Sequence, residues 1–373
     1  SFGEVTIETI LLPRRQATDD YQNALNSHKQ TILLTRESPD IFTLMVNGIA
    51  PENEVRIETR FIQAGVPEKT GFSFRIPLTT APRYLRGDQR SSRHVQGNPI
   101  AVLLDPLHRF AARLTLSGEG SLSSPTHHLK RSEQIYTLSS GDVIPNQDFV
   151  VRFRPTPDEE KITAQVFTSG EKDPCILALI SPPFLQQPRI PLDVIILVDH
   201  SGSMDGRKRK AADSAVIQFL SNLSPKDCFN LCSFDDRQYW YTDRPVRATV
   251  NHIIPAMDLL LHNHSGGTEL GAVIEQALLQ NRSPDSVSRH LIIITDAEVS
   301  DGGRILQIIE NEASRPDSRR CSVLCIDSSP NTLLVRRIVE KSGGISRFLT
   351  STPDQNDISE AISDMLASWE YII

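Results

Sequence analysis

The sequence lacks the features that would mark a membrane protein or a nucleic-acid-binding protein. Its longest apolar runs, such as residues 194–198 and 291–294, are much shorter than the roughly 20 residues that span a bilayer. Acidic side chains (46) outnumber lysine and arginine (39), which gives a net charge of -7. A chain with this balance has no general electrostatic attraction to nucleic acid or to an anionic membrane. We therefore expect no membrane span and no nucleic-acid partner.

Cysteine is scarce and odd in number. The five cysteines are Cys175, Cys228, Cys232, Cys321 and Cys325. Each lies in an apolar, strand-like run, which predicts free, buried thiols. The two Cys-x-x-x-Cys spacings could suit a metal site, but residues four apart on a strand share one face, so core packing is the favoured interpretation. Free thiols favour a reducing compartment such as the cytoplasm, while Asn-x-Ser triplets at Asn222, Asn263 and Asn281 leave secretion as the alternative.

Catalytic motifs are also missing. Ser203 lacks the Gly-x-Ser-x-Gly frame of a nucleophile elbow, and no Gly-x-x-x-x-Gly-Lys phosphate loop occurs. The tripeptide Arg86-Gly87-Asp88 spells a sequence that integrins read, but matches of three residues arise easily by chance. The histidines at 127 and 128 are more typical of surface or packing positions than of a metal site. We therefore predict no enzymatic activity for these residues.

Residues 1–185 predict an antiparallel β domain. Short apolar runs are separated by turn-forming residues, and between 55 and 60 apolar and charged side chains alternate with the period of two that a half-buried strand requires. One helix is expected, at 16–29. Strands are expected at 31–35, 42–46, 55–62, 72–76, 101–104, 149–153 and 176–180. A proline-rich hinge near residues 181–188 then precedes a change of pattern.

Residues 186–373 predict an α/β domain. Residues 193–198 form a continuous apolar strand, as a parallel sheet covered on both faces requires. Strands and amphipathic helices then alternate. Further strands are expected at 228–234, 290–295 and 321–326, and helices at 207–223, 251–262, 270–281, 304–313, 332–342 and 358–369. This order predicts a Rossmann-like, doubly wound parallel sheet with helices on both faces.

Oxygen-bearing side chains follow the first parallel strand. The segment Asp199-His200-Ser201-Gly202-Ser203 offers one carboxylate and two hydroxyls within five residues. Ligands of such folds bind beyond the carboxyl ends of the strands, which is where this segment lies. Hard oxygen ligands suit Mg²⁺, with Mn²⁺ or Ca²⁺ as alternatives, better than Zn²⁺. His200 is expected to lie behind the ligands or to face solvent.

Two further segments add oxygens to the same edge of the predicted sheet. Thr268 follows two glycines at the start of a helix, and Asp296 ends the strand at 290–295. Either segment alone is often a turn or a helix cap. Together with the first loop they predict one divalent-metal site, with Asp199, Ser201, Ser203, Thr268 and Asp296 as its residues.

This set of motifs resembles the metal-ion-dependent adhesion site of von Willebrand factor type A domains. The resemblance covers about residues 191–373. It implies that Ser201 and Ser203 bind the metal directly, that Thr268 binds it directly or through water, and that the two aspartates act mostly through water. It also implies an open metal position for an Asp or Glu side chain of a partner. Ala297 departs from the family, which usually has glycine there, and this puts the local loop shape in doubt.

The N-terminal half resembles the VIT domain, which is found in vault-associated and inter-alpha-trypsin inhibitor proteins. The residues that carry the resemblance are 21–25, 32–34, 40–42, 46–51, 74–77, 81–84, 124–127 and 147–150. It implies a sandwich-like β domain followed by a β segment that joins it to the A domain. Strands that usually precede the helix are missing, which would leave residues 2–12 as an edge strand without neighbours.

The expected function is a binding module that captures an acidic side chain of a partner protein through a bound cation. Two alternatives stay open: a non-catalytic scaffold within a larger enzyme, such as a vault ADP-ribosyltransferase, or a secreted matrix-binding protein like the inter-alpha-trypsin inhibitor heavy chains. The sequence predicts neither the partner nor the oligomeric state.

Overall fold

The computed structural model describes residues 10–38, 41–49, 52, 56–68, 71–78, 108–156, 163–167, 175–179, 190–262, 266–286, 288–297, 299, 301–327 and 330–369. Chain contacts divide the protein into two compact units, residues 1–64 and 65–373. The predicted boundary between residues 185 and 186 lies outside the described residues and stays a prediction. The tripeptide at 86–88 and the strand predicted at 101–104 also lie outside them.

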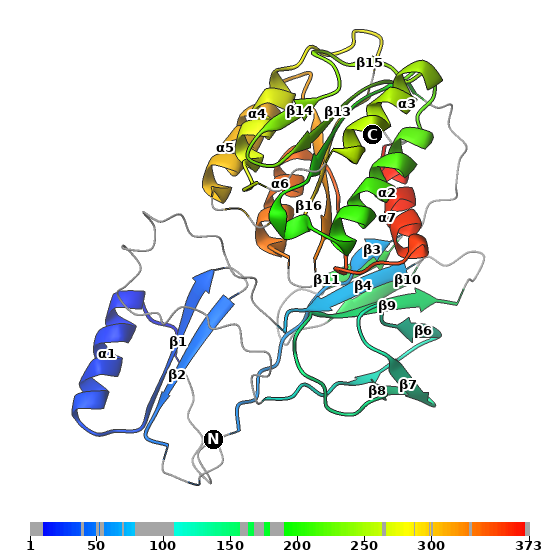
Figure 1. The fold of residues 1–373 in the computed structure, drawn as a ribbon. Helices are drawn as coiled ribbons and strands as arrows, with labels where there is room; N and C mark the ends of the chain where they lie inside the picture. Colours follow the sequence, from blue (N-terminus) through cyan, green and yellow to red (C-terminus); the bar gives the residue numbers. More distant parts are fainter. Residues whose placement is uncertain are drawn as a thin grey trace. The chain divides into compact units, whose positions relative to one another are not determined.

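In its described residues, the first unit has one helix and one β hairpin (Figure 1). Helix α1 (Arg14–Asn26) packs against β1 (Thr31–Ser38), and Tyr21 and Leu33 are buried. β1 pairs antiparallel with β2 (Ile41–Asn47). The helix and both strands predicted in this region are therefore confirmed, with the helix beginning two residues earlier than expected.

The prediction of a strand at residues 55–62 is wrong for residues 56–62, which the structure describes. Residues 56–62 form neither helix nor strand, and the side chains of Ile57, Phe61 and Ile62 are largely exposed. An alternating pattern becomes a strand only where a neighbour accepts its backbone hydrogen bonds. None of the described strands pairs with this segment, so its local pattern has no sheet to join.

The N-terminal part of the second unit consists of antiparallel sheets. One sheet has the order β3-β4-β9-β6 and another the order β5-β8-β7. Their strands are β3 (Val66–Glu68), β4 (Gly71–Ile76), β5 (Arg113–Thr115), β6 (Gly120–Ser123), β7 (Leu129–Ser132), β8 (Ile135–Leu138) and β9 (Phe149–Pro155). Leu138, Phe149 and Val151 form a small core shared by the two sheets. A separate pair joins β10 (Thr163–Phe167) to β11 (Cys175–Leu179).

These antiparallel pairings confirm the predicted strands near 72–76, 149–153 and 176–180. A single VIT-like sandwich over residues 1–185 is not confirmed, because residues 1–64 form a unit of their own. The histidine at 127 is a packing residue, as expected, since its ring lies edge-on to Phe149 at 5.3 Å between centroids.

The C-terminal part is built on a seven-stranded sheet with the order β14-β13-β12-β16-β17-β18, in which β15 also pairs with β13. Its strands are β12 (Leu192–Asp199), β13 (Cys228–Phe234), β14 (Gln238–Trp240), β15 (Val246–Arg247), β16 (Ser288–Thr295), β17 (Arg320–Ile326) and β18 (Ser346–Leu349). β12, β13, β16, β17 and β18 run parallel, whereas β14 and β15 run antiparallel to β13. The sheet is therefore mixed, which corrects the purely parallel prediction.

Helices cover both faces of this sheet (Figure 1). On one face lie α2 (Arg207–Ser221), α3 (Val250–Met257) and α7 (Gln355–Ala367). On the other lie α4 (Leu270–Leu279), α5 (Gly302–Ala313) and α6 (Thr332–Ser342). Along β12, Val194 and Ile196 face the first core and Ile195 and Leu197 the second, all fully buried. Burial on both faces explains the continuous apolar run of this strand.

The strand order reverses at β12. From β12 the chain first adds β13 on one side and later adds β16 on the other. β12 is therefore the switch point of the sheet, and folds of this kind bind their ligands beyond the carboxyl end of the strand at which the order reverses. Asp199, the last residue of β12, lies there.

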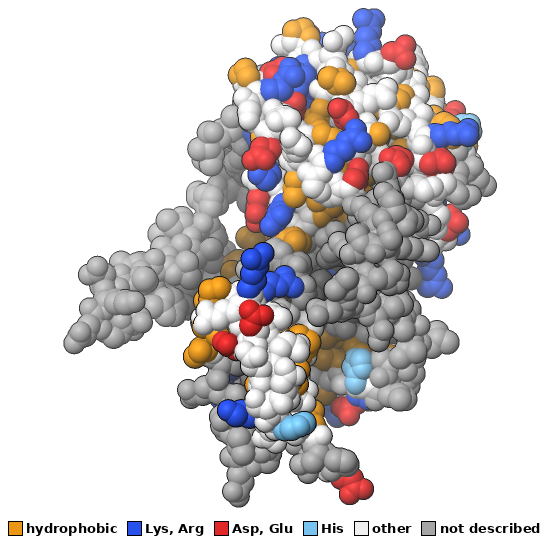
Figure 2. Space-filling model, turned by 90° about the vertical axis from the view of Figure 1, so that its left-hand side faces the viewer, with side chains coloured by type: hydrophobic (Ala, Val, Ile, Leu, Met, Phe, Trp, Pro, Cys, Tyr) orange, Lys and Arg blue, Asp and Glu red, His pale blue; other side chains and the backbone are white. Residues whose placement is uncertain are grey.

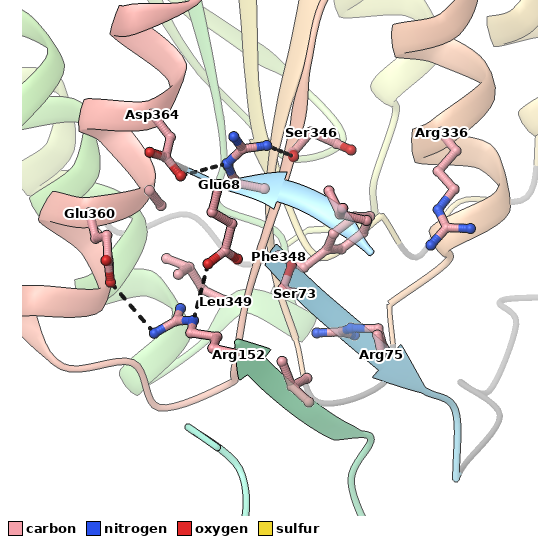
Figure 3. Close-up of a pocket in the computed structure, with 14 residues that line it drawn as sticks. Glu68, Ser73, Arg75, Arg152, Arg336, Ser346, Phe348, Leu349, Glu360 and Asp364 are labelled. Carbon is pink, nitrogen blue, oxygen red and sulfur yellow. Dashed lines mark hydrogen bonds and ion pairs between the residues drawn. The ribbon is translucent and has the colours of Figure 1, made fainter. Parts of the chain in front are cut away.

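The antiparallel sheet β3-β4-β9-β6 contacts the seven-stranded domain through arginine side chains (Figure 3). Arg152 on β9 forms ion pairs with Asp357 of α7 at 2.8 Å and with Glu68 at 3.7 Å. Arg75 on β4 lies over the ring of Phe348 on β18, with its guanidinium carbon 5.1 Å from the ring centroid. The cavity between these elements measures about 50 Å³. It is much smaller than the roughly 300–1,000 Å³ of ligand pockets, so we assign it to packing.

The cysteines of the seven-stranded domain are also packing residues. Cys228, Cys232, Cys321 and Cys325 are free and buried, as predicted. Burial raises the pKa of the Cys232 thiol to about 12, which keeps it protonated and a poor metal ligand.

Among the described helices, none is long and apolar enough to cross a membrane. On the face shown in Figure 2, basic and acidic side chains of the described residues are interspersed.

Candidate metal site

The loop after β12 brings two hydroxyls together. Ser201 precedes a short 3-10 helix (Gly202–Met204), and this tight turn sets the Oγ atoms of Ser201 and Ser203 3.2 Å apart. Adjacent ligands of an octahedral Mg²⁺ at 2.0–2.1 Å would be about 3.0 Å apart. Ser201 is buried and Ser203 half-buried. The spacing of the two hydroxyls therefore suits two neighbouring positions around one small cation.

Asp199 is fixed by hydrogen bonds on both carboxylate oxygens. The backbone N–H of Ser201 donates to Oδ1 at 2.9 Å, and the hydroxyl of Thr295 donates to Oδ2 at 2.6 Å. Thr295 Oγ1 in turn accepts from the Ala297 N–H at 3.0 Å. Thr295 is the last residue of β16, so this chain of bonds joins the carboxyl ends of the two central strands.

The environment of Asp199 disfavours its negative charge. The side chain is fully buried, and burial together with the nearby charge of Asp296 raises the pKa of Asp199 to about 6. The hydrogen bonds from Ser201 and Thr295 act in the opposite direction. A cation beside this carboxylate would stabilise its ionised form. Binding of a cation at this position would therefore lower the pKa of Asp199.

The turn that carries Thr268 is tied to the first loop by its backbone. The N–H of Gly202 donates to the carbonyl of Gly266 at 3.1 Å, two residues before Thr268. On the other side, the N–H of Gly266 donates to Oδ2 of Asp235 at 3.1 Å. Thr268 itself is half-buried just before α4. The structure therefore places its turn beside the hydroxyl loop.

Asp235 is a site residue that the sequence prediction missed. It follows β13, is 4% exposed, and binds the turn before α4 through its carboxylate and also through its carbonyl, which accepts from the Glu269 N–H at 3.0 Å. A carboxylate after a parallel strand was the signal used for Asp199 and Asp296. The same signal applied to β13 would have found Asp235.

Asp296 is held by a cation of the protein itself. Lys208, the second residue of α2, places its Nζ 2.9 Å from Oδ2 of Asp296 and 3.3 Å from Oδ1 of Asp327. Asp296 is fully buried. Burial alone lowers the pKa of Lys208, but the two carboxylates outweigh it and the net shift is upward, so the ammonium stays charged. Neither Lys208 nor Asp327 was among the predicted residues.

Two neighbouring positions have structural roles. Ala297 has a φ of +59° in a left-handed conformation that favours glycine, which explains why glycine is usual here in the family it resembles. His200 is fully buried with Nε2 2.9 Å from Oδ1 of Asp213. Of the two positions expected for His200, facing solvent is therefore wrong, and burial agrees with a position behind the predicted ligands, where the ring contacts α2.

The donor set fits a hard divalent cation. Within the described ranges, no group of three or more His, Cys, Asp or Glu side chains is arranged to hold a metal ion. The predicted set instead combines two carboxylates with three hydroxyls, which are oxygen donors of the kind that Mg²⁺, Mn²⁺ and Ca²⁺ accept. Hydrogen bonds join Asp199 to Ser201 and Ser201 to Ser203. Asp296 directly follows Thr295, whose hydroxyl donates to Asp199. The fifth, Thr268, is brought near by its turn.

Comparison with known proteins identifies this part of the chain. Residues 192–348 match the von Willebrand factor type A domain family. The chain contains a von Willebrand factor type A domain. The A domain explains the mixed α/β sheet and confirms the first of the two resemblances seen in the sequence. Proteins with such domains use them for protein interaction or adhesion, and that general role applies to the A domain here.

The whole chain has homologues among larger proteins. It is 22% identical to von Willebrand factor A domain-containing protein 5A of Rattus norvegicus, over 96% of this chain and 48% of that protein. It is 25% identical to inter alpha-trypsin inhibitor, heavy chain 4 of Mus musculus, over 60% of this chain and 24% of that protein. It is 21% identical to protein mono-ADP-ribosyltransferase PARP4 of Homo sapiens, over 91% of this chain and 20% of that protein. The chain thus spans about half the length, or less, of these relatives.

Proposed function

We propose that the A domain binds a divalent cation, Mg²⁺ with Mn²⁺ or Ca²⁺ as alternatives, and uses it to capture an Asp or Glu side chain of a partner protein. The observation that carries the proposal is the pair of hydroxyls of Ser201 and Ser203, 3.2 Å apart beside the fixed, buried carboxylate of Asp199. Hydroxyls do not neutralise a cation, so a metal held by them keeps charge for an outside carboxylate.

Each residue has a distinct part in this proposal. Ser201 and Ser203 would be direct ligands, and Thr268 would bind directly or through water. Asp199 has both oxygens engaged by protein donors, so it would act mainly through water and through its charge. Asp296 would do the same from the end of β16. The bound cation would supply one electrophilic position that remains open to the partner.

The charge around the loop supports an acidic partner. The first turn of α2 holds four consecutive basic residues, 207–210, and no acidic one. Basic side chains at a helix N-terminus oppose the helix dipole and do not stabilise the helix. Arg207 and Lys210 are exposed, and Asp205 just before the helix offsets one of these charges. We infer that the exposed pair steers acidic segments toward the metal position.

The proposal is tested by calorimetric titration of metal-free protein with Mg²⁺. Asp199→Ala and Ser203→Ala should each lose measurable Mg²⁺ binding while the far-ultraviolet circular dichroism remains unchanged. Asp243→Ala, which removes an exposed carboxylate in the loop before β15, is the matched control and should bind like the unaltered protein. Unaltered protein that binds no Mg²⁺, Mn²⁺ or Ca²⁺, or Asp199→Ala protein that binds as before, would refute the proposal.

Partner capture is tested separately. Immobilised protein should retain its partners in Mg²⁺ and release them in EDTA, and the Asp199→Ala protein should retain none of the EDTA-sensitive set. Retention that survives chelation argues against a bridging cation. Transferase activity is not proposed, although one relative bears that name, because this chain spans only 20% of that protein and no catalytic set was found in the sequence.

A further inference from the structure

Lys208 introduces a positive charge into a cluster of buried acids beside the proposed cation position. Its side chain is 16% exposed, and the two carboxylates that it contacts, Asp296 and Asp327, are 0% and 9% exposed. The charge of Asp296 also acts on Asp199 and contributes to its raised pKa, after burial. In such a poorly solvated place, charges act on each other far more strongly than in water.

The ion pair also engages a particular atom. Oδ2 of Asp296 accepts from the ammonium at 2.9 Å, so this oxygen is directed toward α2. A carboxylate that is engaged in this way is less available as a direct metal ligand. Asp199, Asp296 and Asp327 contribute three negative charges and Lys208 one positive charge, so these four side chains sum to -2; the positive charge of Arg75 also acts on Asp327. A bound divalent cation would bring that sum to zero, whereas without Lys208 the sum would stay at -1.

We propose that Lys208 is a specificity-determining residue that weakens the intrinsic affinity of the site for the cation and strengthens the grip of the bound cation on an acidic partner. This inference rests on the proposed function. Its physical basis is that a fixed positive charge repels the incoming cation but attracts the carboxylate that follows. The two effects have opposite signs, which a merely structural role for Lys208 would not produce.

The experiment uses Mn²⁺ as the metal and acetate as the acidic probe. Electron paramagnetic resonance measures the concentration of free Mn²⁺ and so gives the metal affinity. Acetate is then added to the Mn²⁺-loaded protein, and the decrease that it causes in the relaxation rate of water protons gives its affinity. Lys208→Met keeps the aliphatic stem and removes the charge. It should bind Mn²⁺ about tenfold or more tightly and acetate about tenfold more weakly, because a unit charge is removed from a poorly solvated site. Lys208→Arg, which keeps the charge, should stay close to the unaltered protein.

Two further variants test the balance of charges, and the first of them leaves Lys208 in place in case Lys208→Met unfolds. Asp327→Asn keeps the pair between Lys208 and Asp296 and removes one acid, so it should bind Mn²⁺ more weakly. The double variant Lys208→Met/Asp327→Asn restores the net charge of -2 and should return Mn²⁺ affinity to near that of the unaltered protein. Equal or weaker Mn²⁺ binding by Lys208→Met, or tighter binding by Asp327→Asn, overturns the inference. Failure of the unaltered protein to bind Mn²⁺ overturns instead the proposed function on which it rests.

Discussion

Thr295→Val tests whether the carboxylate of Asp199 must be held in place for a cation to bind. Thr295 is not one of the proposed ligands. Its hydroxyl donates to Oδ2 of Asp199 at 2.6 Å and accepts from the Ala297 N–H at 3.0 Å. Valine has nearly the same shape, so the buried end of β16 keeps its packing while both hydrogen bonds are lost.

The expected size of the effect follows from the two lost bonds. A hydrogen bond to a charged group contributes roughly 1.5–3 kcal/mol, and a buried N–H left without an acceptor costs roughly 1–3 kcal/mol. We therefore expect the metal-free protein to lose about 2.5–6 kcal/mol of its free energy of unfolding. Losing a partner behind a metal ligand typically weakens metal affinity by roughly 10–100-fold, and we expect that range for Mg²⁺.

The effect on Mg²⁺ affinity should also depend on pH. The hydrogen bond from Thr295 lowers the pKa of Asp199, which burial and Asp296 raise to about 6. Without that bond the pKa rises further, and more of the carboxylate is protonated at neutral pH. Since a cation binds the ionised form, the defect of Thr295→Val should be larger at pH 6 than at pH 8.

The measurement is calorimetric Mg²⁺ titration at both pH values, with urea unfolding of the metal-free protein beside it. Thr242→Val is the matched control, because Thr242 also donates its hydroxyl, to Asn230 and to the Arg244 carbonyl, in a turn before β15. It should lose stability but keep Mg²⁺ affinity. If Thr295→Val binds Mg²⁺ within twofold of the unaltered protein at pH 6, the bond to Asp199 does not position the site and the reasoning fails.

Two further changes separate loop geometry from general stability. Gly266→Ala should weaken Mg²⁺ binding several-fold in calorimetry, because its new Cβ would lie 2.6 Å from Oδ1 of Asp236 and 3.0 Å from Oδ2 of Asp235, whereas Gly267→Ala, with open space around its Cβ, should bind normally. Burial lowers the pKa of His290 to about 3. Between about pH 6.5 and pH 3, the unfolded chain therefore binds a proton at His290 that the folded chain does not bind. As the pH falls through this window, the free energy of unfolding decreases by up to about 1.4 kcal/mol per pH unit. His290→Leu should flatten this part of the stability curve in urea unfolding, and an unchanged slope would refute the assignment.

The sequence predicted most of the A domain because its elements are long and strongly patterned. The run at 193–198 is apolar throughout, and the structure buries it on both faces. Strands β14 and β15 were missed, because two or three residues are too few to show a period. The segment at 56–62 shows the converse failure, since a clear alternation formed no strand and none of the described strands pairs with it. Patterns report which face a side chain prefers, and pairing partners come from elsewhere in the fold.

The same division between local and distant information holds at the candidate site. The oxygens of the first loop are neighbours in sequence, and their spacing could be read directly. Lys208 and Asp327 are 119 residues apart and meet because the start of α2 lies beside the residues that directly follow β16 and β17. Asp235 reaches Gly266 across 31 residues. Such contacts depend on the register of the sheet, which sequence periodicity does not specify.

The hydrogen-bond pattern bears on which atoms would touch a cation. Both oxygens of Asp199 are engaged by Ser201 and Thr295, and Oδ2 of Asp296 by Lys208. The carboxylates are thereby committed to protein donors before any metal binds, while the hydroxyls of Ser201 and Ser203 contact each other and can turn toward a cation without losing a charged partner. We infer that the fold itself selects hydroxyls as inner ligands and keeps the acids behind them. That arrangement would hold a cation by charge at a distance, and it would leave the metal electrophilic enough to bind a partner's carboxylate.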